Sequence, residues 1–161
     1  MKHKKSMRIA SNAFGEGSSL PPEYSAKGGN TKPKMRIEDV SPATKSLALV
    51  FYDLDKGGGA WTHWVVWNIP PDSREVKGEE GTTSSGNKSY SGPDLPPDSG
   101  IHRFVFHAFA LNRELKLQSS AGRSELESAM SGHIIEEYKL MVRYGRPKPP
   151  KKRNEKNKIK N

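Results

Sequence analysis

Two apolar runs separated by a glycine cluster constrain the fold of this chain most strongly. Residues 46–53 read Ser-Leu-Ala-Leu-Val-Phe-Tyr-Asp, and residues 61–69 read Trp-Thr-His-Trp-Val-Val-Trp-Asn-Ile. Between them stands the triplet Gly57-Gly58-Gly59. Runs rich in Val, Ile, Phe and Trp on either side of such a triplet are typical of a β-hairpin. Both alternating sets of side chains in residues 46–53 are apolar, which predicts a central strand or a sheet covered on both faces.

The alternation of side chains also predicts which residues share a face. In the run 61–69 the odd-numbered residues are expected on one face: Trp61, His63, Val65, Trp67 and Ile69. Residues 101–111 form a third apolar run, whose even-numbered residues from His102 to Ala110 share a face. Shorter alternating runs at 35–40 and 138–144 are predicted as further strands.

One helix is predicted, over residues 122–137. Ser124 stands at a cap position with Glu127 at the capping-box spacing, and apolar residues follow at helical spacing: Leu126, Met130, Ile134 and Ile135. Gly132 interrupts this pattern, so two shorter helical pieces are an alternative. Because strands dominate and their connections are long, we predict a mostly β fold, an antiparallel Greek-key β-sandwich with a helix in its C-terminal half.

Charge divides the chain into three parts. The net charge is +9, of which residues 146–161 carry +7 and residues 1–8 carry +4, so residues 9–145 carry −2. We therefore predict a basic N-terminal extension over 1–8, a single domain over 9–145 and a basic, disordered tail over 146–161. Basic ends of this kind attract phosphate-bearing surfaces without sequence or ligand specificity. The same charge pattern is also typical of solvated ends that only keep a protein in solution.

Several classes of protein are excluded by what the sequence lacks. It has no cysteine, which rules out disulfides, thiolate metal sites and a cysteine nucleophile. No run approaches the roughly 20 apolar residues of a membrane helix. The basic start is not followed by the apolar segment of a secretory signal, so a cytoplasmic location is expected. No nucleophile elbow, phosphate-binding loop or dinucleotide fingerprint is present, which favours a non-enzymatic protein without a cofactor.

Polar residues at the ends of the predicted strands form the candidate site. Asp53 and Asp55 follow the first run, His63 lies near the start of the second, and His102 opens the third. These residues meet at one rim only if the second and third strands run in the same direction. Imidazole N–H groups backed by carboxylates, with a stiff Gly/Pro loop at 92–97 nearby, would suit a phosphate or carboxylate group.

Two other interpretations use the same sequence features. Two histidines and two aspartates could hold a divalent metal ion, as a metal-binding protein or a metal-dependent hydrolase, although no local metal signature supports this. The basic tail could bind nucleic acid or an anionic membrane. Arg103 is expected to point away from His102 and to pair with Asp53 or Asp55.

The ordered motifs of the chain resemble those of the phosphatidylethanolamine-binding proteins, also called the Raf kinase inhibitor family, in their short prokaryotic form. The resemblance covers roughly residues 7–146. The family's Asp-Pro-Asp-Ala-Pro signature falls on residues 53–57, and its Trp-x-His motif on residues 61–63. Its Gly-x-x-Pro-Pro motif falls on residues 92–97, and its Gly-x-His-Arg-Tyr motif on residues 100–104.

This resemblance implies a large and a small antiparallel sheet and an anion pocket for phosphate-like head groups. The pocket residues it implies are Asp53, Asp55, Trp61, His63, Pro96, Pro97 and His102, with Gly92, Arg103 and Phe104 in support. The implied partners are a phosphate-bearing small molecule or lipid head group and, for some members, a protein kinase; a homodimer is a further expectation. Nucleic acid is expected only at the tail.

The chain also departs from the family pattern near the pocket. Leu54, Lys56 and Gly57 replace Pro, Ala and Pro, and one extra residue lies within 92–97. Phe104 replaces a tyrosine and removes a hydroxyl donor. Lys56 is expected to add a cation near the mouth of the pocket.

Overall fold

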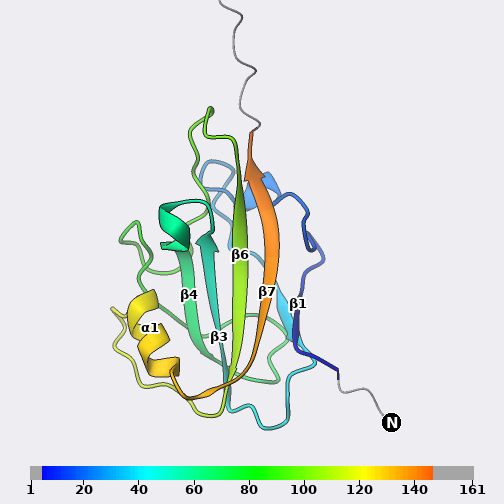
Figure 1. The fold of residues 1–161 in the computed structure, drawn as a ribbon, viewed down its shortest axis with the longest axis vertical. Helices are drawn as coiled ribbons and strands as arrows, with labels where there is room; N and C mark the ends of the chain where they lie inside the picture. Colours follow the sequence, from blue (N-terminus) through cyan, green and yellow to red (C-terminus); the bar gives the residue numbers. More distant parts are fainter. Residues whose placement is uncertain (1–4, 147–161) are drawn as a thin grey trace, which may run out of the picture.

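The apolar runs form the strands of a large sheet that faces a small one. The computed structural model describes residues 5–146 (Figure 1). The large sheet consists of β3 (Ser46–Asp53), β4 (Trp61–Ile69), β5 (Glu79–Glu80), β6 (Ile101–Leu111) and β7 (Ile134–Gly145). The small sheet consists of β1 (Arg8–Ala10) and β2 (Arg36–Glu38). Two 3-10 turns, η1 (Pro22–Tyr24) and η2 (Gly57–Gly59), and one helix, α1 (Arg123–Met130), complete the elements of this part of the chain.

The strand order of the large sheet confirms the Greek-key prediction. The order is β5-β4-β3-β6-β7, and every neighbouring pair is antiparallel. After β5 the chain returns to lie beside β3, which is the fourth-strand connection of a Greek key. Because β3 lies antiparallel to both β4 and β6, these two strands run in the same direction. This common direction of β4 and β6 is the condition under which His63 and His102 can lie at one rim of the sheet.

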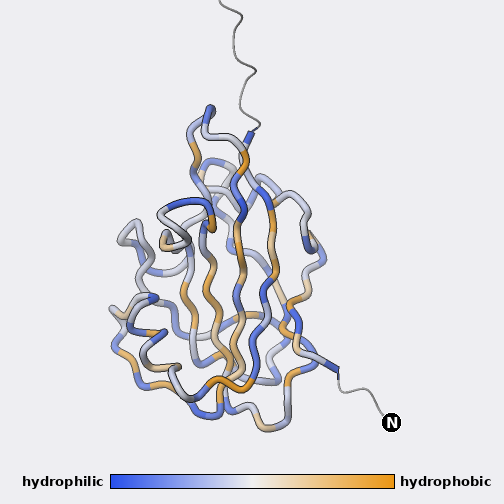
Figure 2. The backbone as a smooth tube through the Cα atoms, viewed as in Figure 1, coloured by the Kyte–Doolittle hydropathy of each residue, from blue (hydrophilic) through white to orange (hydrophobic). Residues whose placement is uncertain are grey.

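Hydrophobic residues cover both faces of the large sheet. The inner cluster lies between the two sheets and joins Leu49 and Phe106 to Ile9 and Ile37. The outer cluster lies beneath α1, whose Leu126 and Met130 pack with residues such as Val50 and Trp67. Figure 2 shows hydrophobic residues along the strands and a hydrophilic tip of the loop at the upper end. The prediction of a strand covered on both faces is therefore confirmed for β3.

Two irregularities in the pairing of β3 with β4 overturn the prediction of a single face, because Trp61, His63 and Ile69 do not share the face of Val65 and Trp67. Phe51 pairs with Trp64 but Tyr52 pairs with Thr62, so His63 is an extra residue on β4. Such a bulge re-aims a side chain. The His63 ring packs against Phe51 on the inner face, whereas Val65 and Trp67 belong to the outer cluster. A second shift, next to Asn68 with its φ of 53°, returns Ile69 to the inner face.

The helix is shorter than predicted, and its cap lies elsewhere. It ends at Met130, the chain turns at Gly132 with a φ of 82°, and β7 begins four residues earlier than predicted. Gly122 is the N-cap residue, and Glu125 accepts a hydrogen bond from the Gly122 N–H at 3.2 Å. Because glycine has no side chain, only this half of a capping box is present, and the predicted Ser124–Glu127 box is not formed. Ile134 and Ile135 therefore belong to a strand. Their apolar character alone did not distinguish a helix from an edge strand.

The predicted ends are only partly described by the structure. Met7 is buried and β1 begins at Arg8, both within the segment predicted as an extension. The predictions for residues 1–4 and 147–161 lie outside the described residues. Within residues 5–146, no helix is long and apolar enough to cross a membrane.

Candidate functional site

The end of β3 and the starts of β4 and β6 meet at one rim of the large sheet. Figure 1 shows η2, the arrowhead of β3 and the start of β6 at the same upper end. Asp53 pairs with Trp61 on one side and with Phe104 on the other. The topology therefore places the predicted aspartates and histidines close together.

Asp53 is a buried carboxylate whose two oxygens are both engaged. The Nδ1–H of His102 donates to Asp53 Oδ2 at 2.7 Å, and the backbone N–H of Asp55 donates to Asp53 Oδ1 at 2.9 Å. Asp53 is only 1% exposed, and a buried carboxylate needs such partners. Asp53 therefore orients both the His102 ring and the turn after β3, in agreement with the predicted carboxylate-backed imidazole.

Asp55 is engaged by Arg103 and orients no histidine. Arg103 Nη2 donates to Asp55 Oδ1 at 2.6 Å, and its Nε and backbone N–H donate to Oδ2 at 3.0 and 2.8 Å. The hydrogen bond from the Arg103 side chain lowers the pKa of Asp55 to about 2. The expected pairing of Arg103 is thus present, but Asp55 is used to fix the loop.

His63 is oriented by a backbone carbonyl and not by an acid. Its Nδ1–H donates to the Ser91 carbonyl oxygen at 2.6 Å, and the Ser91 N–H donates to the His63 carbonyl oxygen at 2.9 Å. Burial lowers the pKa of His63, which favours the neutral ring. The Nε2 atom has no hydrogen bond with the described residues. A neutral His63 therefore offers an acceptor there, whereas the sequence predicted a donor.

A cavity of about 250 Å³ opens at this rim. Of the predicted residues, it is lined by Asp53, Trp61, His63 and Gly92; the other lining residues are Ala26, Lys56, Ser85, Ser91, Asp94 and Leu95. Lys56 Nζ lies 3.8 Å from the centre of the Trp61 ring, a cation–π contact at the mouth. Lys56 therefore supplies the cation that the sequence predicted near the mouth of the cavity.

Other predicted residues lie beside the cavity and do not line it. Pro96 and Pro97 are exposed, and Leu95 takes the place expected of them. His102 bonds to Asp53 and is not one of the lining residues. Phe104 is fully buried, with its ring centre 5.6 Å from that of His63 and 6.4 Å from that of His102.

The residues that sequence reasoning missed come from distant loops. Ser91 is 28 positions from His63, and Ser85 and Asp94 belong to the same long connection between β5 and β6. Its length was the only signal, since long irregular loops in compact domains are often functional. Gly92 has a physical reason to be glycine, because a Cβ atom there would lie 2.3 Å from the Tyr24 carbonyl oxygen.

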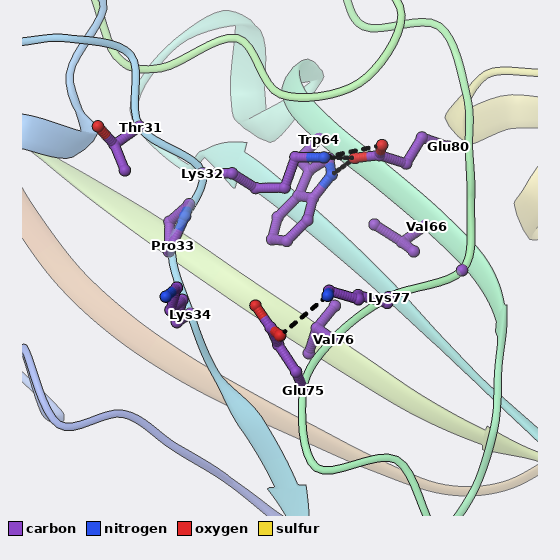
Figure 3. A pocket seen from close by; sticks show the side chains of 11 residues that line it. Thr31, Lys32, Pro33, Lys34, Trp64, Val66, Glu75, Val76, Lys77 and Glu80 are labelled. Atoms are coloured by element: carbon purple, nitrogen blue, oxygen red, sulfur yellow. Dashed lines mark hydrogen bonds and ion pairs between the residues drawn. The ribbon is translucent and has the colours of Figure 1, made fainter.

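A larger cavity, of about 500 Å³, lies between residues 31–34 and 75–80. Figure 3 shows Lys32 and Trp64 directed at the carboxylate of Glu80. The Trp64 Nε1–H donates to that carboxylate at 2.6 Å and Lys32 lies 2.8 Å from it, while Lys77 pairs with Glu75 at 3.3 Å. These two lysines are therefore paired with carboxylates, whereas Lys34, which also lines this cavity, makes no ion pair with the described residues.

Metal ligands are not gathered at the rim. Among the described residues, no group of three or more His, Asp, Glu or Cys side chains is placed to hold a metal ion. Asp53 and Asp55 are both committed to protein hydrogen bonds. The metal alternative therefore has no geometric support in this part of the chain.

A β-sandwich with an open cavity at one rim defines a ligand-binding fold. The sequence model of the phosphatidylethanolamine-binding protein family matches residues 10–145. A UPF0098 protein of Methanothermobacter thermautotrophicus is 36% identical over 152 residues, covering 87% of this chain and 99% of the relative. Another, of Pyrococcus horikoshii, is 35% identical over 156 residues, covering 89% of this chain and 78% of the relative.

Solved structures agree with the sequence matches. The crystal structure of a phosphatidylethanolamine-binding protein homologue from Chlamydia trachomatis superposes with a TM-score of 0.80 at 32% identity, covering 88% of this chain and 98% of that one. Escherichia coli YbcL has the same fold, with a TM-score of 0.80 at 23% identity, covering 88% of this chain and 99% of that one. The chain belongs to the phosphatidylethanolamine-binding protein family, in its prokaryotic branch.

Proposed function

We propose that the chain is a binding protein, and not an enzyme, whose rim cavity holds a small phosphate-bearing ligand. The observation that supports this most is that Lys56 and His63 line one cavity, with only the Nδ1 atom of His63 engaged by the described residues. Lys56 supplies a cation for a phosphate oxygen, and His63 supplies a second, oriented polar contact. Ser85, which also lines the cavity, adds a hydroxyl group.

The carboxylates at the cavity limit which ligands fit. Asp53 is a buried carboxylate that already accepts hydrogen bonds from two N–H donors, so its oxygens are committed to the protein. Asp94 is exposed and lies 3.8 Å from Lys27. A ligand that combines a phosphate with a cationic group, as the phosphoethanolamine head group does, would satisfy both Lys56 and Asp94. The family's name points to the same head group.

The size of the cavity fits a head group alone. Pockets for drug-sized ligands usually measure about 300–1,000 Å³, and this one measures about 250 Å³. A molecule of the size of phosphoethanolamine would fit within it.

The test is a calorimetric titration with phosphoethanolamine. We expect Lys56→Met to weaken binding about fivefold, since an exposed charge contact is worth about 1 kcal/mol, and to reduce its salt dependence. Methionine keeps an apolar stem over Trp61. Lys45→Met, at the opposite end of the sheet, is the control and should leave the affinity unchanged. Absence of any measurable binding to the unmodified protein would overturn the proposal.

The remaining partner predictions are independent of this cavity. Inhibition of a protein kinase and formation of a homodimer stay predictions from the sequence. Binding of nucleic acid or anionic membranes through the tail concerns residues outside those the structure describes.

A further inference from the structure

Asn30 clamps the loop that orients His63. The Gly92 N–H donates to Asn30 Oδ1 at 2.6 Å, and Asn30 Nδ2 donates to the Tyr90 carbonyl oxygen at 3.3 Å. The two bonds hold the backbone on either side of Ser91. Asn30 has a left-handed φ of 52°, a conformation in which asparagine is favoured over most residues. Its own N–H donates to the Ser25 carbonyl oxygen at 2.8 Å.

The neighbouring contacts make this loop rigid. The Tyr90 hydroxyl donates to the Tyr24 carbonyl oxygen at 2.6 Å, and the Ala26 N–H donates to the Pro93 carbonyl oxygen at 2.9 Å. Residues 24–30 therefore hold the loop on both sides of the Ser91 carbonyl through these hydrogen bonds. This carbonyl is the group that receives the His63 Nδ1–H.

That hydrogen bond sets the chemistry of the other ring nitrogen. A carbonyl oxygen can only accept, so Nδ1 carries the proton and Nε2 of the neutral ring carries a lone pair. The charged groups around the ring oppose one another: Asp53 at the end of β3 favours the charged ring, and Lys56 in the following turn disfavours it. Asp94, from the loop before β6, lines the same cavity, and His102 of β6 lies beyond Asp53. Burial is the largest influence and favours the neutral ring.

Resting on the proposed function, we propose that this site selects ligands that donate a hydrogen bond to His63 Nε2. Phosphate monoesters in their singly protonated form meet this requirement, whereas phosphodiesters do not. Asn30 is the positioning residue that sets this selectivity, because it fixes the carbonyl that holds His63 in its acceptor form. The bound monoester donates its P–OH proton to Nε2 and accepts from Lys56 through another oxygen.

The first test compares methyl phosphate with dimethyl phosphate, which are both monoanions at mildly acidic pH. At pH 5.5, below the second pKa of methyl phosphate, we expect calorimetry to show at least about tenfold tighter binding of methyl phosphate, the equivalent of one hydrogen bond to a charged group. The second pKa of a phosphate monoester is about 6, and that of His63 lies below its ordinary value. At a pH above both of these pKa values, the complex contains one proton that neither the free protein nor the free ligand carries. The affinity should therefore fall about tenfold for each further pH unit.

The second test removes the clamp without straining the backbone. Asn30→Gly keeps the left-handed φ accessible and deletes both side-chain hydrogen bonds. The matched control is Asn68→Gly, because Asn68 has a φ of 53° and clamps Leu115 through two bonds of 2.8 Å, far from the cavity. We expect the Asn30→Gly variant to bind methyl phosphate and dimethyl phosphate with nearly equal affinity. We also expect it to change the ¹⁵N shifts that report the His63 tautomer. Asn68→Gly should preserve both.

The outcomes separate this inference from the proposed function. If methyl phosphate fails to bind the unmodified protein at any pH, the proposed function fails. If it binds but dimethyl phosphate binds equally well, or if the two asparagine variants keep the same preference, only the selectivity and the role of Asn30 are overturned. The ¹⁵N spectrum of the unliganded protein gives an independent check, since an Nδ1 without its proton would contradict the inference by itself.

Discussion

Replacing Phe106 by alanine is expected to lower the free energy of unfolding by about 3–5 kcal/mol, as truncation of a buried phenylalanine usually does. Phe106 is fully buried on the central strand β6. Its ring stacks on Phe51 at 3.9 Å and on Phe14 at 5.4 Å, so it links the large sheet to the N-terminal segment that covers it. The loss combines the removed apolar surface with the cavity left between the sheets.

Urea unfolding followed by tryptophan fluorescence measures this loss. Ile101→Ala on the same strand is the control, because that side chain is 51% exposed and its truncation should cost less than about 0.5 kcal/mol. A loss below about 1 kcal/mol for Phe106→Ala would contradict the core described here.

Replacing His63 by phenylalanine should weaken the binding of phosphate monoesters by on the order of 10- to 100-fold. Phenylalanine keeps the aromatic packing against Phe51 and Phe104 but removes both ring nitrogens. A hydrogen bond to a charged group contributes about 1.5–3 kcal/mol, which corresponds to the stated loss of affinity. The Ser91 carbonyl also loses its donor, so the loop that borders the cavity should become less ordered.

The matched control for this variant is His107→Phe. His107 also lies on a strand of the large sheet, stacks on Phe109 at 4.0 Å and bonds to Glu137 at 2.9 Å, but it belongs to the other face. Its replacement should leave monoester binding unchanged. Equal losses in the two variants would show that the effect is general destabilisation and not the loss of a ligand contact.

Much of the fold could be predicted because the strands carry strong local signals. The three long runs were placed with the bounds that β3, β4 and β6 have in the structure. The Gly57–Gly59 triplet correctly marked the turn between the first two. The helix prediction failed after Met130, because Ile134 fits both the helical spacing after Met130 and the period-two pattern that continues through Leu140. Only the pairing of β7 with β6 resolves that ambiguity.

Less of the candidate site could be predicted, because its geometry depends on contacts across the chain. The shared rim was predicted only on the condition that the second and third strands run in the same direction. Alternation predicted that Arg103 pairs with Asp53 or Asp55, and the structure shows that the partner is Asp55. The bulge at His63 could not be foreseen, since no glycine or proline marks it and it exists only in the pairing with β3. Ser91 acts through its backbone carbonyl, and the Asn30 side chain binds backbone groups of a loop about 60 positions away. A sequence carries no direct sign of which backbone groups a loop will present.

The central claim is that His63 and Lys56 hold a phosphate monoester between them. A crystal structure of the protein grown with phosphoethanolamine tests it most directly. The account predicts density for a phosphate with one oxygen within about 3 Å of His63 Nε2 and another within hydrogen-bond reach of Lys56 Nζ. An ordered phosphate bound among Lys32, Lys34 and Lys77 instead, with the rim cavity unoccupied, would contradict it.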